Sequence, residues 1–353
     1  MRTNHFLFAA FVAAFLSGAS FSTAQNSTEN SSKKSFVLYS VFVNVLPDDF
    51  DFPGIGFVNV ARGKHSTAYV GFVNYADSLR GAQISFINTA RQLRGAQIGF
   101  INTTGQLNGA QISFINTAGR LNDGAQIGFI NTAGRLNSGA QIGFINSCSG
   151  DKIAQIGFVN THVGNLSGTQ IGFINTNTGK LKGFQLGFVN YADSISGVPL
   201  GFISIVRKGG YRALEAGVSE IAPVNLSFKL GVEKLYTSFN VACNFDTEQK
   251  IFFGLGIGSI IPLKKSFFFN PEITVMNTAN FDRSHTQQTF TSFVPAFGYS
   301  YKRLNFIAGI SASHLYTKDG EMSNVPFFQI VEHKFDAQNK IFLGARAGVR
   351  IVL

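Results

Sequence analysis

Residues 95–102 read Gly-Ala-Gln-Ile-Gly-Phe-Ile-Asn, and residues 124–131 and 139–146 repeat this octapeptide without a change. Related units recur at a spacing of 14 or 15 residues. Their phenylalanines mark twelve copies: Phe42, Phe57, Phe72, Phe86, Phe100, Phe114, Phe129, Phe144, Phe158, Phe173, Phe188 and Phe202. A repeat this short cannot bury a core alone, so neighbouring copies must share one.

Each unit alternates as an extended strand requires. Ala82, Ile84, Phe86 and Asn88 fall on one face, while the glutamine falls on the other. We expect the isoleucine and phenylalanine columns to meet Leu93 of the following turn and to form a shared apolar centre. The links between strands carry Gly, Asn, Thr and Arg, which is typical of tight turns.

Parallel stacking of such units would align their amide side chains at about 4.8 Å. The expected glutamine ladder comprises Gln83, Gln97, Gln111, Gln126, Gln141, Gln155, Gln170 and Gln185. The expected asparagine ladder comprises Asn88, Asn102, Asn116, Asn131, Asn146 and Asn160. No proline interrupts the chain between Pro53 and Pro199, which suits an uninterrupted hydrogen-bond ladder. These patterns predict a parallel β-solenoid of about twelve coils over residues 35–206.

One alternative is a membrane-spanning meander in which each repeat is one transmembrane strand. The alternation allows it, but the links between repeats are all alike and most carry a leucine, such as Leu107 or Leu136. Outer-membrane barrels instead alternate short turns with long loops. The solenoid is therefore favoured, and one large barrel stays open.

The QIGF(I/V)N units resemble those of bacterial surface-repeat proteins of unknown function found in spirochaetes and Bacteroidetes, over roughly residues 40–205. This resemblance implies no catalytic residue. In shape alone, the units are similar to the short coils in the heads of trimeric adhesins.

The N-terminus predicts export. An apolar run from Phe6 to Leu16 follows a basic residue and leads into small residues up to Ala24, the pattern of a secretory signal peptide. We assign residues 1–24 to a cleaved signal peptide and residues 25–34 to a polar linker. Elsewhere no stretch approaches the roughly 20 apolar residues of a membrane-spanning helix, so membrane insertion would require β-strands.

Charges and cysteines narrow the function classes. The 29 basic and 19 acidic residues are dispersed among turns, and no run of them resembles a nucleic-acid patch. Cys148, which replaces a turn residue in one repeat, lies far from Cys243, and this spacing argues against a disulfide scaffold. The histidines show no metal-ligand spacing and the glycines form no phosphate loop. We therefore expect no metal, no cofactor and no nucleic-acid partner.

The second half changes to longer alternating segments. In residues 339–353 every second residue from Ile341 to Leu353 is apolar, whereas Arg346 and Arg350 lie on the opposite face. A lipid-embedded barrel strand requires this pattern. Eight such segments predict an antiparallel, eight-stranded outer-membrane-type barrel over residues 210–353: 212–220, 223–233, 235–245, 250–261, 266–277, 289–301, 303–316 and 339–353.

Strand parity also predicts the chemistry of the barrel interior. Six charged residues fall on polar faces: Glu215, Lys229, Glu233, Glu272, Arg346 and Arg350. Charges in a narrow, poorly hydrated lumen must pair. We expect an ion-paired plug in which Glu215 meets Arg346 or Arg350 where the first and last strands close the barrel.

This half resembles small outer-membrane barrels of the outer-membrane protein A type, in pattern and in its terminal strand rather than in a sharp motif. The resemblance implies a membrane anchor. A soluble barrel or sandwich that buries its apolar face is the alternative.

Together these features predict a non-enzymatic envelope protein exported to the outer membrane of a Gram-negative-type bacterium. Outer-membrane lipid would surround the barrel, and a glycan or protein ligand would bind the repeat face, on the periplasmic or the exterior side. The alternative is a small lipid-modifying enzyme with an accessory repeat domain, for which Ser313 and His314 are a hint. That dipeptide is weak, and no catalytic residue is assigned.

Overall fold

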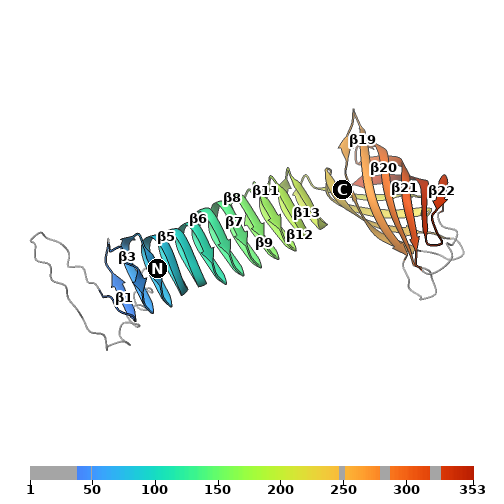
Figure 1. The fold of residues 1–353 in the computed structure, drawn as a ribbon. Coiled ribbons are helices and arrows are strands. Elements are labelled where there is room, and N and C mark those ends of the chain that lie inside the picture. The colour runs from blue at the N-terminus through green and yellow to red at the C-terminus, as the bar shows by residue number, and fades with distance from the viewer. Residues whose placement is uncertain (1–37, 49, 246–250, 279–286, 319–326) are drawn as a thin grey trace, which may run out of the picture. The chain divides into compact units, whose positions relative to one another are not determined.

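The computed structural model describes residues 38–48, 50–245, 251–278, 287–318 and 327–353. It is all-β, with a parallel solenoid followed by a closed antiparallel barrel, which confirms the predicted fold class (Figure 1). The expected signal peptide and linker lie outside the described residues. Among the described residues, no helix is long and apolar enough to cross a membrane.

The solenoid forms about eleven turns over residues 43–208. Its strands are β1 (Val43–Leu46), β2 (Gly54–Ile55), β3 (Val58–His65), β4 (Ala68–Val70), β5 (Val73–Ile112), β6 (Ile115–Ile127), β7 (Ile130–Ile142), β8 (Ile145–Ile156), β9 (Val159–Val163), β10 (Thr169–Ile171), β11 (Ile174–Leu181), β12 (Phe184–Ile195) and β13 (Val198–Lys208). By compactness the chain divides into two units, the first ending at Val163 and the second beginning at Gly164.

Equivalent residues of successive repeats pair with each other. Between β6 and β7, for example, Asn116 pairs with Asn131 and Gln126 pairs with Gln141. This register brings every side chain beside its counterpart one coil away. The repeated sequence therefore becomes columns of like residues.

The expected apolar centre of Ile and Phe is wrong: these side chains lie outside and the amides lie inside. Gln111 and Asn116 are fully buried, whereas Ile112 and Phe114 are 42% and 44% exposed. The reason is that both amides point inward. Strict alternation would put Gln111 and Asn116 on opposite faces, but a bend at residues 113–114 places Phe114 and Ile115 outward in succession, so that both amides share the interior. The interior then holds Gln, Asn, a small residue and the turn leucine of each coil.

The buried amides satisfy one another and the backbone. Gln126 donates to Oε1 of Gln111 at 2.8 Å and to the carbonyl of Thr132 at 3.0 Å, and its own Oε1 accepts from Gln141 at 2.7 Å. A buried polar group without such partners would cost about 1–3 kcal/mol. Each glutamine therefore depends on the coils above and below it.

The asparagines stabilise the bend itself. Asn116 donates to the Ile127 carbonyl in the next coil at 2.9 Å and to Oδ1 of Asn131 at 2.9 Å. The bent backbone leaves carbonyls pointing inward, and the asparagine column supplies their donors. The bend therefore recurs in register with the asparagine column.

The barrel consists of eight strands: β14 (Tyr211–Val218), β15 (Val224–Val232), β16 (Leu235–Cys243), β17 (Ile251–Gly258), β19 (Phe267–Thr278), β20 (Gln288–Tyr301), β21 (Leu304–Thr317) and β23 (Asn339–Val352). The short strands β18 (Ile261–Pro262) and β22 (Val331–Lys334) pair only with β19 and β23, respectively, among the described residues. Strand β14 pairs with both β15 and β23, so the sheet closes on itself.

The two ends of the barrel differ. Residues 233–234 and 302–303 form two-residue turns at the end where the barrel chain begins and finishes, and residues 259–266 connect β17 to β19 at the same end. The connections at 244–250, 279–287 and 318–338 belong to the opposite end, and the last two are the longest of the barrel. The first hairpin connection, residues 219–223, is also at this opposite end.

Candidate functional site

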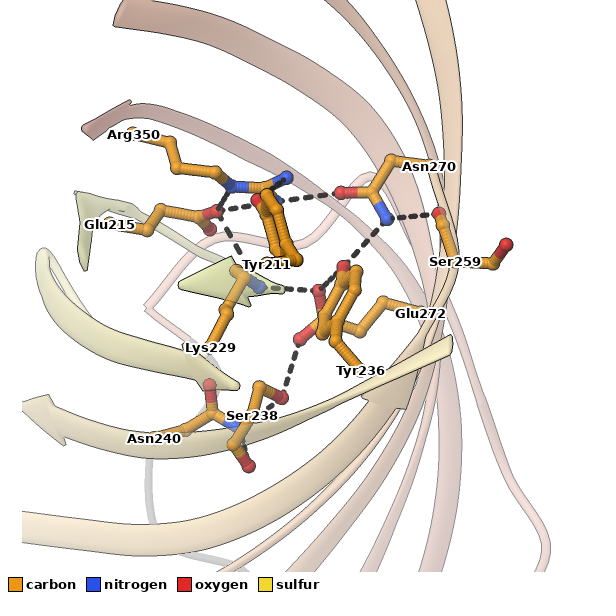
Figure 2. Close-up of polar contacts among 10 residues, drawn as sticks. All are labelled: Tyr211, Glu215, Lys229, Tyr236, Ser238, Asn240, Ser259, Asn270, Glu272 and Arg350. Atoms are coloured by element: carbon orange, nitrogen blue, oxygen red, sulfur yellow. Dashed lines mark hydrogen bonds and ion pairs between the residues drawn. The ribbon is translucent and has the colours of Figure 1, made fainter. Parts of the chain in front are cut away.

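Four charged side chains meet inside the barrel (Figure 2). Glu215 on β14 and Arg350 on β23 lie directly opposite each other in the register, with Oε2 2.7 Å from Nη2. Lys229 on β15 places its Nζ 2.6 Å from Oε2 of Glu272 and 3.5 Å from Oε2 of Glu215. Two carboxylates and two cations therefore form one group with no net charge.

Neutral donors and acceptors surround this network (Figure 2). The hydroxyl of Tyr236 donates to Glu272 at 2.8 Å, and Ser238 donates to the other oxygen of that carboxylate at 2.8 Å. Arg350 donates to Oδ1 of Asn270 at 2.7 Å and to the Tyr211 hydroxyl at 2.9 Å. Such additional hydrogen bonds offset the desolvation of buried ions.

Of the six residues predicted for the lumen, the structure brings four together and places two elsewhere. Arg346 lies beside a different carboxylate, with Nη2 3.8 Å from Oε1 of Glu220. Glu233 is exposed in the turn between β15 and β16 and takes no part. Parity places Glu233 inward, but β15 ends at Val232 and the chain turns away from the lumen there.

Sequence reasoning missed Glu220. Parity turns it outward, but β14 ends at Val218 and the connection folds back into the barrel, where Glu220 and Ile221 are fully buried. Ser313 donates to Oε1 of Glu220 at 2.9 Å. The sequence signal for its burial was a glutamate beside apolar residues in the short connection 219–223.

An apolar layer closes the lumen between the charged network and the barrel end that carries the connection 219–223. Its eight buried members are Ile221, Ala222, Ala242, Phe252, Met276, Phe290, Leu315 and Phe342. Phe290 contacts Phe252 and Phe342 edge-on, with ring centroids 5.4 Å and 6.4 Å apart. Between the layers, a cavity of about 10 Å³ beside Arg346 has room for roughly one water molecule. Side chains therefore fill the interior.

The outer wall of the barrel is apolar. Among the residues of its eight strands, every Glu, Lys and Arg except Arg212 stands at a position whose side chain points into the lumen. Outward side chains such as Leu226, Ile273 and Ile310 are 54–57% exposed. A hollow of about 550 Å³ crosses this wall near the closing strands, lined by small residues such as Ala308 and by Phe297.

The solenoid carries a polar groove of about 460 Å³ near its N-terminal end. Arg80 and Arg94 occupy equivalent positions in successive coils along one side, and Gln92 and Gln106 do so along the other. Leu93 and its counterparts one coil away form the buried floor. Neither arginine forms an ion pair with a described carboxylate. The groove therefore offers two free guanidinium groups along the stack.

The structure does not assemble a hydrolase-type site from the Ser-His dipeptide. Ser313 points into the lumen, whereas His314, the next residue on the strand, points the opposite way and contacts Oδ1 of Asn339 at 3.1 Å. No group of three or more His, Cys, Asp or Glu among the described residues could hold a metal ion.

Cys148 is a core residue rather than the turn residue that the sequence indicated. It pairs with Ala133 of the preceding coil, is buried, and receives a hydrogen bond on Sγ from Gln155 at 3.4 Å. Burial raises the pKa of its thiol to about 12. Both cysteines are free, so the described chain holds no disulfide.

No family model matches this sequence, and neither a curated protein nor a solved structure is significantly similar to it.

Proposed function

We propose that this chain is a non-enzymatic envelope protein anchored in the outer membrane by its barrel, with the solenoid in a structural or binding role. One observation carries the proposal: the charged side chains of the barrel strands, Arg212 excepted, point inward and the outer wall is apolar. A water-soluble protein has the opposite distribution. A closed β-barrel with a filled, polar interior satisfies its whole backbone within lipid.

The two barrel ends also support an outer-membrane orientation. Outer-membrane barrels have short turns on the periplasmic side and longer loops outside. Here both two-residue turns and both barrel termini share one end, which supports a periplasmic position for the solenoid that precedes the barrel through Lys208 at the end of β13. Protease treatment of intact cells tests this side: the repeats stay intact if they are periplasmic and are cut if they are displayed.

The anchor is tested with the full-length protein. We expect it to require detergent for extraction and to migrate faster on SDS gels before boiling than after. Leu255→Arg puts a cation on the outer wall in the middle of β17. A lipid-facing arginine near the bilayer midplane lowers the stability of the inserted barrel by about 2–4 kcal/mol. Leu263→Arg, in the exposed turn after β18, is the matched control. A wild-type protein that stays soluble and monomeric without detergent would refute the anchor.

For the binding role, the polar groove favours an acidic glycan. Its two arginines, Arg80 and Arg94, lie one coil apart, so they can meet two neighbouring acidic sugars of an extended chain. We expect polygalacturonate to bind and neutral dextran not to bind. The double variant Arg80→Gln, Arg94→Gln should lose this binding, whereas Lys264→Gln with Arg303→Gln, which removes the same charge from barrel turns, should retain it.

A further inference from the structure

An apolar ridge runs along the coils of the solenoid. From Phe57 to Phe202, the residue two before each repeat phenylalanine and the residue after it are Ile, Val or Leu in all coils. Most of the phenylalanine rings are 41–44% exposed, and so are most of the preceding aliphatic side chains. These three columns define the ridge, and no charged or polar residue interrupts them.

The ridge is a convex corner of each coil. Ile112, Phe114 and Ile115 lie on the two sides and at the apex of the bend at residues 113–114, while Gln111 and Asn116 point inward. Neighbouring rings are stacked, with centroids 4.8–5.2 Å apart and planes within 6° in each described pair along the column. Within each of the two units, the apex is therefore an edge of stacked aromatic rings.

This apolar surface is too large for a coil stack surrounded by water. With about 200 Å² for a phenylalanine side chain, the exposed fractions from Phe57 to Phe158 amount to roughly 700 Å² for the rings of the first unit alone. Monomeric soluble proteins rarely expose contiguous patches above a few hundred Å². Something apolar must cover the ridge.

Charged residues opposite the ridge make the coils amphipathic in cross-section. Arginines of the solenoid such as Arg120 and Arg135 lie at the turn on the other side of the coil, next to the buried leucines. Each of these coils thus has one apolar corner and one charged corner. Elements with this division bind at membrane interfaces with the apolar side in the hydrocarbon boundary.

We propose that the ridge is inserted into the surface of the membrane that holds the barrel, with lipid hydrocarbon as its occupant; the choice of membrane rests on the proposed anchor. A fluid lipid layer can follow a convex edge, whereas two rigid convex edges would touch only along a line. In the second unit the ring column also continues onto the barrel wall, because Phe202 lies edge-on against Phe239 of β16, with centroids 5.1 Å apart. The apolar surface of the barrel and the ridge are therefore continuous at that point.

Site-directed fluorescence quenching on the full-length protein in liposomes tests the ridge. In a Cys243→Ser background, Cys148 stays buried and unlabelled. An environment-sensitive fluorophore is placed on Phe114→Cys at the ridge, on Arg120→Cys at the charged corner of the same coil, or on Leu255→Cys on the barrel wall. Nitroxide-labelled lipids are the quenchers. We expect at least a two-fold quench at positions 114 and 255 and none at position 120.

The outcomes distinguish a failure of the ridge proposal from a failure of the proposed membrane anchor. Quenching at position 255 without quenching at position 114 would overturn the ridge proposal and leave the anchor intact. A dimer with a water-shielded but unquenched label at position 114 would also overturn it, in favour of a second copy as occupant. No quenching at any position would refute both.

A second variant guards against misfolding. Phe100→Ser, Phe114→Ser and Phe129→Ser together remove three neighbouring rings that lie outside the core. With the fluorophore on Ile98→Cys, also on the ridge, quenching at position 98 should fall at least two-fold when the three rings are removed. Quenching at position 255, measured in a parallel protein, should be unchanged. Equal quenching at position 98 before and after the substitutions would contradict the proposal.

Discussion

Glu215 and Arg350 face each other across the strand pair that closes the barrel, 135 residues apart in sequence, with their charged groups 2.7 Å apart. Because β14 is the first barrel strand and β23 the last, this ion pair forms only when the cylinder is complete. Lys229 contacts Glu215 from the next strand and extends the pair to Glu272. Barrel closure and charge pairing are thus the same event.

Glu215→Gln should destabilise the barrel strongly. It leaves the interior with an uncompensated positive charge on Arg350 and Lys229, and breaking a buried pair in this way costs about 3–5 kcal/mol. We expect a lower urea midpoint for the loss of the fast-migrating folded band on SDS gels. Glu233→Gln, in the exposed turn, makes the same chemical change and should leave the midpoint where it was.

The double variant Glu215→Gln, Arg350→Gln restores neutrality. Its loss of stability should be smaller than the sum of the two single losses, by about 0.5–3 kcal/mol of coupling. Additive losses would mean that the two side chains do not interact across the seam.

The glutamine column predicts a second effect, in the solenoid. Gln126→Lys places an ammonium group among buried amides and removes the acceptor for Gln141, so the coils around it should unfold. Gln126→Leu removes the same hydrogen bonds without adding a charge and should cost about 1–3 kcal/mol. Ile127→Lys, one residue away on the exposed ridge, should leave the coils folded in detergent. Circular dichroism during urea unfolding measures all three; a Gln126→Lys protein as stable as wild type would contradict the buried ladder.

Cys148 reports the integrity of the same coils. Its thiol is buried and its pKa is raised to about 12, so at pH 8 it is neutral, shielded and resistant to alkylation. The partly exposed Cys243 should react first. The folded state binds the thiol proton more tightly than the unfolded state does. The contribution of Cys148 to the free energy of unfolding is therefore complete below the unfolded-state thiol pKa of about 8.5 and is lost as the pH rises from there toward the folded-state value. Mass spectrometry after a pulse of maleimide should show one label in native protein and two in urea, and two labels in native protein would refute the burial.

The barrel could be predicted from the sequence almost strand by strand. Each of its eight strands lies at one of the eight predicted segments, because an apolar wall on one side and a polar lumen on the other impose a period of two that is visible in the residues. The interior pairing was harder to predict. Parity ignores where a strand ends, so it places Glu233 inside and misses Glu220, which its connection folds into the lumen.

For the solenoid, the sequence predicts the architecture but not which side chains are buried. Its repeat length and parallel stacking follow from the spacing of Phe100 and Phe114. Of the side chains expected in the apolar centre, however, the turn leucines are buried and the isoleucines and phenylalanines lie outside. Hydropathy favours burial of Ile and Phe, whereas the stack buries Gln111 and Asn116 because a column of identical amides can satisfy itself from coil to coil. Only the bend at residues 113–114, which the sequence does not mark clearly, decides between the two arrangements.

The two interior layers of the barrel predict a closed lumen with redundant seals. In planar bilayers we expect the wild-type protein to show no steady conductance. Phe290→Ala opens a space between Phe252 and Phe342 and should cost about 3–5 kcal/mol, yet the charged network still blocks the lumen. Glu215→Ala with Arg350→Ala removes a neutral pair and leaves the aromatic layer in place, so it should also stay closed. Only the triple variant should conduct steadily. A large steady pore in the wild-type protein would refute the filled lumen, and full conductance from Phe290→Ala alone would show that the charged network does not seal it.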